Sequence, residues 1–279
     1  MILNPTTVNL ADCHVMAIIN LTPDSFYAQS RALGEENLER RMATAIEEGA
    51  TIVDIGGYSS RPGAADVDVE SEWSRVSRGL QSVASLNRGV VVSLDTFRAE
   101  IVRRAYEEYG PIIVNDISAG ELDEAMVDTV AQLQLTYVAM HMRGNPNTMS
   151  RLTEYPDGVV SGVVEYFKHR TAELQVTGIS RERIILDPGF GFAKSVEQNY
   201  ELMAGLDSLV ELGYPVLVGV SRKSMIYKPL SITPNEALPG SLALAWESLR
   251  RGATILRVHD VAATRQVVDV FNNYKSVIL

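Results

Sequence analysis

The sequence predicts an α/β fold, a (β/α)8 TIM barrel built as a single domain over residues 1–279. Short apolar runs rich in β-branched residues alternate with segments of helical spacing, and this alternation occurs eight times. No Pro-, Gly- or Ser-rich linker and no shift in composition divides the sequence. Buried parallel strands read as continuous apolar runs, and eight strand–helix pairs are typical of a closed barrel. An open doubly wound sheet is the alternative, but no Gly-x-Gly-x-x-Gly opens the first predicted helix.

Each predicted strand is a short apolar run that ends in a polar residue or a turn. In chain order the strands are expected at residues 15–20, 51–56, 90–95, 112–117, 137–142, 184–187, 215–221 and 253–260. Pro188 and Gly189 follow the sixth run, so Asp187 is expected at the exposed end of a buried strand.

The predicted helices carry apolar residues at helical spacing and a charged opposite face. They are expected at residues 36–48, 70–86, 99–109, 124–133, 159–176, 199–212, 241–250 and 262–274. Several are followed by a glycine, where a left-handed C-cap is common: Gly49, Gly110, Gly178, Gly213 and Gly252.

Composition and charge exclude several classes of protein. With 46% hydrophobic and 22% charged residues the chain can bury a large core, which excludes a disordered protein. The net charge of −10 disfavours nucleic acid or an anionic membrane as a partner. The single cysteine, Cys13, cannot form an intramolecular disulfide, and we expect it to be a partly buried apolar residue of a cytoplasmic protein. The N-terminus lacks the regions of a signal peptide.

Polar residues gather at the ends of the predicted strands. In a barrel the active site lies at the carboxyl ends of the strands, so these side chains are expected to converge. They are Asn20, Asp54, Asp95, Asn115, Asp116, His141, Asp187, Ser221, Arg222, Lys223, Arg257 and His259.

The last two strands supply cations. Arg222 and Lys223 follow the seventh strand, while Arg257 and His259 lie two residues apart at the end of the eighth and are expected to share a face. Barrels commonly bind phosphate after strands seven and eight, which predicts an anion site here. A hydrogen-bonded core histidine is the alternative for His259.

Asp95, Asn115 and Asp187 end the third, fourth and sixth predicted strands. A planar heterocycle with a guanidine-like edge needs a carboxylate that accepts two parallel N–H bonds and an amide beside it. Each carboxylate alone could instead cap a helix, and Asp95 before Thr96 is a suitable cap. Three such residues at strand ends favour ligand binding.

Two loops near the expected mouth have ambiguous sequences. Asn20 begins Asn-Leu-Thr-Pro-Asp-Ser-Phe, which is either turn chemistry or, beside a diphosphate, an oxygen ligand for Mg²⁺. The two glycines Gly56 and Gly57 permit close backbone approach, and Ser60 and Arg61 beyond them could reach a ligand.

Together these strings resemble the dihydropteroate synthase family of the pterin-binding barrel superfamily. The similar motifs run in order over nearly the whole chain, from about Met16 to Val268. They are Asn-Leu-Thr-Pro-Asp-Ser-Phe at 20–26, Asp-Ile-Gly-Gly at 54–57, Ser-Arg-Pro-Gly at 60–63, Asp-Thr at 95–96, Asn-Asp-Ile at 115–117, Met-His-Met-Arg-Gly-Asn-Pro at 140–146, Asp-Pro-Gly-Phe-Gly-Phe at 187–192, Ser-Arg-Lys-Ser at 221–224 and Arg-Val-His-Asp at 257–260.

The resemblance implies a reaction and roles for particular residues. The family joins 4-aminobenzoate to 7,8-dihydropterin-6-ylmethyl diphosphate, giving dihydropteroate and diphosphate in folate biosynthesis, by a dissociative mechanism assisted by Mg²⁺. Family members are typically homodimers. The implied pterin site comprises Asp95, Asn115, Asp187 and Lys223 with Met140 and Phe192 beside the ring; the diphosphate site Asn20, Arg257 and His259, with Mg²⁺ near Asn20; and the aminobenzoate site Ser60, Arg61, Pro62 and Ser224.

Four places depart from the family pattern. Residues 27–30 are Tyr-Ala-Gln-Ser where the family usually has Ser-Asp-Gly-Gly, Tyr58 replaces a glutamate, and Ala193 and Tyr227 replace glycines. Two other functions remain open. One is a methyltetrahydrofolate–corrinoid methyltransferase on the same barrel, which has no diphosphate to hold, and the other is a non-catalytic pterin-binding paralogue.

Overall fold

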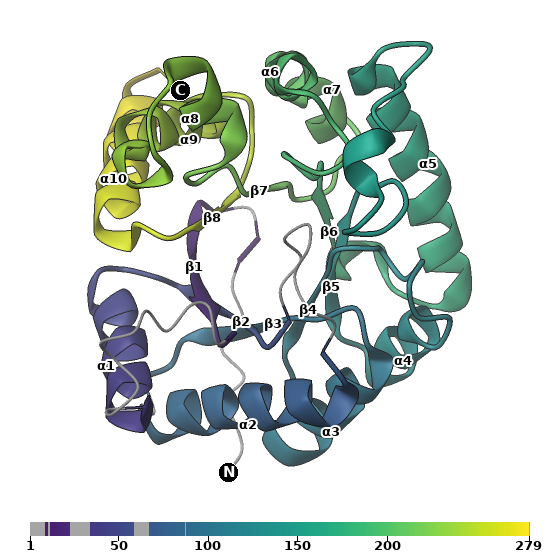
Figure 1. The fold of residues 1–279 in the computed structure, drawn as a ribbon, viewed down its shortest axis with the longest axis vertical. Helices are drawn as coiled ribbons and strands as arrows, with labels where there is room; N and C mark the ends of the chain where they lie inside the picture. The colour runs from purple at the N-terminus through teal and green to yellow at the C-terminus, as the bar shows by residue number, and fades with distance from the viewer. Residues whose placement is uncertain (1–8, 11, 23–33, 59–66, 87, 279) are drawn as a thin grey trace.

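Eight parallel strands form one sheet that curls into a barrel (Figure 1). The structure is a computed structural model, and it describes residues 9–10, 12–22, 34–58, 67–86 and 88–278. The strands are β1 His14–Asn20, β2 Ile52–Gly56, β3 Val91–Asp95, β4 Ile113–Asp116, β5 Thr136–Met140, β6 Ile184–Asp187, β7 Leu217–Val218 and β8 Ile255–Val258. The predicted (β/α)8 fold is confirmed.

The order of the strands nearly closes the sheet. Neighbouring strands follow β6-β5-β4-β3-β2-β1-β8-β7, and β6 meets the start of β7 through a bridge between Leu186 and Val216. The Leu186 amide donates to the Pro215 carbonyl at 2.9 Å. β7 is shorter than the predicted 215–221, so Ser221 belongs to the loop after the strand.

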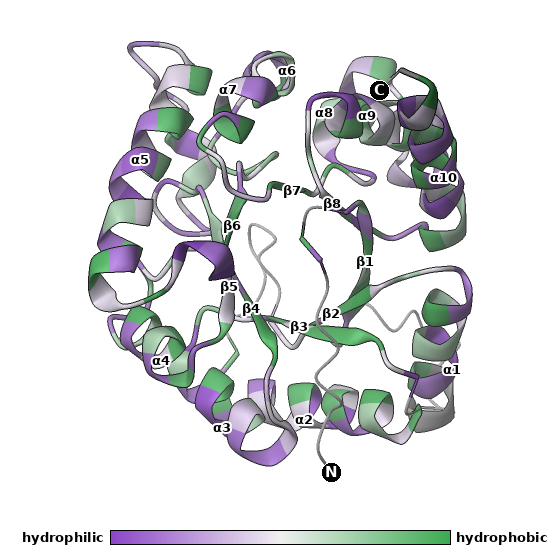
Figure 2. Cartoon of the chain, turned by 180° about the vertical axis from the view of Figure 1, so that it is seen from behind, coloured by the Kyte–Doolittle hydropathy of each residue, from purple (hydrophilic) through white to green (hydrophobic). Residues whose placement is uncertain are grey.

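Ten α-helices of the described chain surround the strands (Figure 1). They are α1 Gly34–Glu47, α2 Val69–Leu86, α3 Ala99–Tyr109, α4 Met126–Leu133, α5 Val159–Thr177, α6 Val196–Ala204, α7 Leu206–Val210, α8 Ser224–Leu230, α9 Leu238–Arg250 and α10 Val261–Ile278. Figure 2 shows mostly hydrophobic strands inside a ring of helices with mixed surfaces. None of the helices described is long and apolar enough to cross a membrane.

Two predictions about helices were wrong. The single helix expected at 199–212 is divided at Gly205 into α6 and α7. No helix was predicted over α8, which contains Pro229. Because proline has no N–H, Met225 O cannot receive the usual bond from four residues later, and the Tyr200 hydroxyl donates to this carbonyl instead, at 2.9 Å.

The barrel interior is apolar near the start of the strands. One side chain from each strand forms this floor: Met16, Ile52, Val91, Ile113, Val138, Ile185, Leu217 and Ile255. Residues two positions later face the same interior, nearer the carboxyl ends. That second layer is mostly polar, and its members are Ile18, Asp54, Ser93, Asn115, Met140, Asp187, Gly219 and Arg257.

Candidate active site

Asp54 is the centre of the second layer on the β2–β4 side. Its side chain is fully buried and accepts three hydrogen bonds. Ser93 Oγ donates to Oδ1 at 2.6 Å, Asn115 Nδ2 donates to Oδ2 at 3.1 Å, and Arg257 Nε donates to Oδ2 at 2.7 Å. A buried carboxylate is stable only when it is paired and hydrogen-bonded, and Asp54 meets both conditions. It therefore orients Asn115 and Arg257.

Arg257 joins two carboxylates. Besides Asp54 it reaches Asp95 Oδ2, 2.6 Å from its terminal nitrogen. Burial alone would lower the pKa of Arg257, but Asp54 and Asp95 outweigh it and raise that pKa, so the guanidinium stays charged. Burial raises the pKa of Asp95 to about 7, against the opposing charge of Arg257 and with the support of Asp54. Asp95 thus changes charge near neutral pH.

Asp187 and Lys223 lie on the opposite, β6–β7 side of the site. Asp187 Oδ1 accepts from the Gly189 amide at 2.8 Å, and Lys223 Nζ donates to the Phe190 carbonyl at 2.5 Å. Burial raises the pKa of Asp187, which the charge of Lys223 opposes. Burial lowers the pKa of Lys223 to about 8, which Asp187 opposes. Both groups use backbone partners and keep bonding capacity for a ligand.

An apolar cluster lies beside these polar groups. Met140 and Phe192 belong to it together with Ile117, Met142, Met149, Ala193 and Phe97. The Lys223 ammonium is 4.9 Å from the centre of the Phe192 ring. An apolar wall next to a carboxylate and an ammonium suits a flat heterocycle with a polar edge.

Lys194 and His141 hold the loop that carries Asp187. Lys194 Nζ is 3.0 Å from His141 Nδ1, 3.0 Å from the Gly189 carbonyl and 2.9 Å from the Phe192 carbonyl. Burial first, and then the charge of Lys194, lower the pKa of His141 to about 2, so the ring is neutral and its Nδ1 can accept a hydrogen bond from Lys194 Nζ. Gly189 has φ +69°, and a Cβ there would lie 2.0 Å from His141 O, so only glycine fits.

Sequence reasoning did not single out Lys194. The only signal for Lys194 is that it ends the loop that begins at Asp187. Its position in the sequence does not show whether the side chain is buried or exposed. Asp116 is another strand-end residue with a structural task, because it accepts from the Tyr137 hydroxyl at 2.7 Å and from the Ser118 and Gly120 amides. Asp116 and His141 therefore support loops and do not face the mouth with bonding capacity to spare.

The cations after β7 and β8 have different partners. Arg222 pairs with Asp260 through two bonds of 2.8 and 2.7 Å and also donates to the Pro234 and Asn235 carbonyls. β8 ends at Val258, so His259 leaves the extended geometry. Its Nδ1 lies 3.2 Å from Ser221 Oγ, whereas Arg257 is bound to Asp54 and Asp95. That Arg257 and His259 together hold an anion stays a prediction.

The remaining predicted residues occupy different parts of the rim. Asn20 is the last residue of β1 and is half-buried. Ser224 is the first residue of α8, directly after Lys223. Ser60, Arg61 and Pro62 lie outside the described residues, as do the unusual residues 27–30.

Comparisons with known proteins agree with this geometry. Residues 16–259 match the model of the family described as pterin binding enzyme. The dihydropteroate synthase of Escherichia coli K12 is 40% identical over 265 residues, which are 95% of this chain and 93% of the relative. The chain belongs to the dihydropteroate synthase family. The expectation of a transferase enzyme is confirmed with it.

Two solved structures of dihydropteroate synthase from Xanthomonas albilineans are similar to the chain. One, with 4-aminobenzoic acid, is 37% identical with a TM-score of 0.87 and covers 95% of this chain and 94% of its own. The other, in complex with 7,8-dihydropteroate, is 34% identical with a TM-score of 0.85 and covers 97% of each chain.

Two departures from the dihydropteroate synthase pattern have visible surroundings. The Tyr58 ring packs edge-on against Phe97 at 5.1 Å, and the Arg98 guanidinium lies 5.5 Å from the Tyr58 centroid. Arg98 in turn pairs with the buried Glu72 at 2.6 Å. Ala193 has φ +50°, a conformation that glycine adopts without strain, so the alanine strains this loop of the family fold.

Proposed function

We propose that the protein condenses 7,8-dihydropterin-6-ylmethyl diphosphate with 4-aminobenzoate to give 7,8-dihydropteroate and diphosphate. The observation that carries this proposal is the pair of polar groups on either side of one apolar wall. Asp95, Asn115 and Arg257 lie on the β2–β4 side, and Asp187 and Lys223 lie on the β6–β7 side. A dihydropterin presents polar edges around a flat ring, and this arrangement can meet both edges.

Asp187 and Lys223 are proposed to bind the pterin directly. One oxygen of Asp187 accepts from Gly189, which leaves the other for the guanidine-like edge of the ring. Lys223 donates one bond to Phe190 O and can donate to a carbonyl or ring nitrogen with its other protons. Met140 and Phe192 would cover the ring faces.

The mechanism we propose is dissociative. The diphosphate leaves first, and nearby carboxylates such as Asp95 and Asp187 favour the cationic pterin that results. The aniline nitrogen then captures the cation without a strong base, because it is unprotonated at neutral pH. Ser60, Arg61, Pro62 and Ser224 are proposed to orient the aminobenzoate, and Ser224 is placed next to Lys223.

Mg²⁺ is proposed as the cofactor, with Asn20 as its protein ligand. The described residues hold no group of three or more His, Cys, Asp or Glu side chains suited to a metal. Mg²⁺ commonly takes one or two protein oxygens and completes its shell with phosphates and water, so a single half-buried amide at the mouth fits. When bound, the ion would neutralise charge on the leaving diphosphate.

We further propose a cytoplasmic homodimer. α10 exposes a run of apolar side chains, with Val270 59%, Tyr274 51% and Val277 86% exposed. Trp246 of α9 packs against Tyr274, with ring centres 5.6 Å apart, and continues this surface. Exposed apolar surface of this kind favours a protein interface. Light scattering of the purified protein gives the mass, and a monomer at micromolar concentration would contradict this part.

The decisive test is product formation by purified protein. The protein is given the dihydropterin diphosphate with and without 4-aminobenzoate and Mg²⁺, and both dihydropteroate and diphosphate are measured. We expect Mg²⁺-dependent diphosphate release, with dihydropteroate only when 4-aminobenzoate is present. Pterin binding without diphosphate release would instead indicate the non-catalytic paralogue, and methyl transfer from methyltetrahydrofolate to a corrinoid would indicate the methyltransferase.

A further inference from the structure

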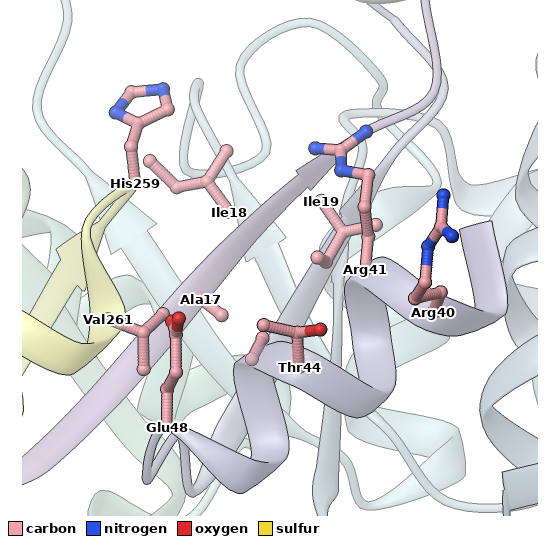
Figure 3. A pocket seen from close by; sticks show the side chains of 10 residues that line it. Ala17, Ile18, Ile19, Arg40, Arg41, Thr44, Glu48, His259 and Val261 are labelled. Atoms are coloured by element: carbon pink, nitrogen blue, oxygen red, sulfur yellow. The ribbon is translucent and has the colours of Figure 1, made fainter. Parts of the chain in front are cut away.

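A cavity of about 240 Å³ lies between β1, α1 and the turn from β8 to α10 (Figure 3). β1 pairs with β8 only as far as Ala17 and Val258, so the two strands separate beyond this point. Ile18 and Ile19 border the gap on one side and His259 on the other. The cavity therefore reaches the rim of the barrel at the end where the active site lies.

Arg41 projects from α1 into this cavity. Figure 3 shows its side chain extending toward the carboxyl end of β1. The guanidinium is half-buried, and no residue in the described part of the chain accepts a hydrogen bond from it or pairs with it. Burial lowers the pKa of Arg41 from its usual value. A partly desolvated guanidinium without an acceptor is unfavourable, which points to an acceptor supplied by a ligand.

Three other cations near the mouth already have acceptors. Arg257 is neutralised by Asp54 and Asp95, and Arg222 by Asp260. Lys223 donates to a backbone carbonyl, and the negative charge of Asp187 acts on its ammonium group. A diphosphate group carries several negative charges, and a cation that already has two carboxylates gains little from it. Arg41 has its charge available.

The charge along the cavity fixes where an anion can lie. Thr44 and Arg40 also line it from α1, while Glu48 lies at the opposite end from the Arg41 guanidinium (Figure 3). The Glu48 carboxylate repels an anion at its own end. The favourable position is thus the end bordered by Arg41 and His259, which faces the rim.

We propose that Arg41 is a substrate-binding residue that reaches the terminal phosphate of the diphosphate through the gap between β1 and β8. A guanidinium matches phosphate oxygens with two parallel N–H bonds. That the diphosphate belongs to a dihydropterin ester rests on the proposed function. The charge and position of Arg41 suit any phosphoryl anion.

The test uses inorganic diphosphate as the probe, titrated into the full-length protein with Mg²⁺ by calorimetry. Arg41→Ala is expected to weaken binding about tenfold to a hundredfold, and Arg41→Lys by less, since lysine keeps the charge but not the planar fork. The matched control is Arg78→Ala, which removes an exposed arginine of α2 and should leave the affinity unchanged. Equal affinities of Arg41→Ala and Arg78→Ala, or no binding to wild-type protein, would overturn the inference.

Turnover separates this inference from the proposed function. If diphosphate binding depends on Arg41 but no dihydropteroate forms, the anion site stands and the synthase proposal falls. If dihydropteroate forms and Arg41→Ala keeps the wild-type KM for the diphosphate ester, the synthase proposal stands and the role of Arg41 falls. Thermal unfolding of Arg41→Ala and Arg41→Lys is the control for correct folding, and we expect both variants to unfold cooperatively near the wild-type temperature.

Discussion

The two sides of the active site differ in how far their polar groups are already bonded. On the β2–β4 side, Asp54 accepts from Ser93, Asn115 and Arg257, and Arg257 continues to Asp95. On the β6–β7 side, Asp187 and Lys223 each bond to one backbone group. The first side is a network of side chains bonded to one another, and the second presents groups that are held by the backbone and have bonding capacity for a ligand.

This difference separates groups that are held by one another from groups that are held by the backbone. Side chains that bond to one another form a rigid network, and removing one member leaves the others unpaired. Groups held by the backbone keep their position when a neighbouring side chain is removed, and they lose mainly the ligand. Substitutions on the β6–β7 side should therefore abolish activity with little loss of stability, whereas those on the β2–β4 side should reduce both.

The largest expected effect is on activity at Lys223 and Asp187. Lys223→Ala and Asp187→Asn should each lower kcat/KM about 10²- to 10³-fold, as the loss of one preorganised polar group at a reacting centre does. Their melting temperatures should stay close to that of the wild type. Steady-state kinetics and thermal unfolding measure this, with exposed Lys228→Ala as the control. Wild-type kcat/KM in either variant would remove that residue from the site.

Arg257→Ala should reduce stability as well as activity. It leaves the buried carboxylate of Asp54 and the partly buried carboxylate of Asp95 without their cation, which costs about 3 kcal/mol of unfolding free energy. Arg222→Ala is the comparison, because its partner Asp260 is more accessible to water than Asp54 and the loss should be smaller. Denaturant unfolding gives both values. Equal losses of unfolding free energy would show that the network around Asp54 stabilises the fold no more than the Arg222–Asp260 pair does.

The raised pKa of Asp95 predicts a dependence of stability on pH. The folded protein binds a proton at Asp95 up to about pH 7, whereas the unfolded chain releases it near pH 4. The contribution of Asp95 to the unfolding free energy is thus full at low pH. It is lost as the pH rises to 7, by at most about 1.4 kcal/mol per pH unit. Unfolding free energies of wild type and Asp95→Asn, measured from pH 5 to 8, should converge at low pH. Parallel profiles would contradict a raised pKa.

The smallest effect is a gain in stability at Ala193. Its φ of +50° costs an L-residue about 1 kcal/mol, so Ala193→Gly should raise the unfolding free energy by somewhat less than that, about 0.5 kcal/mol. Ala172→Gly in the exposed middle of α5 should instead lower it by about 1 kcal/mol. A loss of stability at both positions would mean that Ala193 is not strained.

Much of the fold was predictable because its signals are local. The apolar runs gave all eight strands, and Ile184–Asp187 and Ala99–Tyr109 have the predicted bounds. Cys13 is partly buried, as expected for a small apolar residue. The errors are local too: a glycine divided one expected helix, and α8 was not predicted.

The pairings inside the site were less predictable, because they join residues far apart in the chain. Arg257 and Asp54 are separated by 203 positions in the sequence. Neither motif indicates that the arginine pairs with a carboxylate of the protein itself. Lys194 and Arg41 were missed for a related reason. Their burial depends on the packing of a loop and of a helix against strands, which spacing along the sequence does not reveal.

The most direct test is a crystal structure of the protein with a bound dihydropterin. The account predicts that the ring lies against Phe192 and Met140, with the free oxygen of Asp187 and Lys223 Nζ bonded to its edges. Arg257 should remain paired with Asp54. A ring held on the β2–β4 side alone, with Arg257 released from Asp54, would contradict the division between a supporting and a binding side.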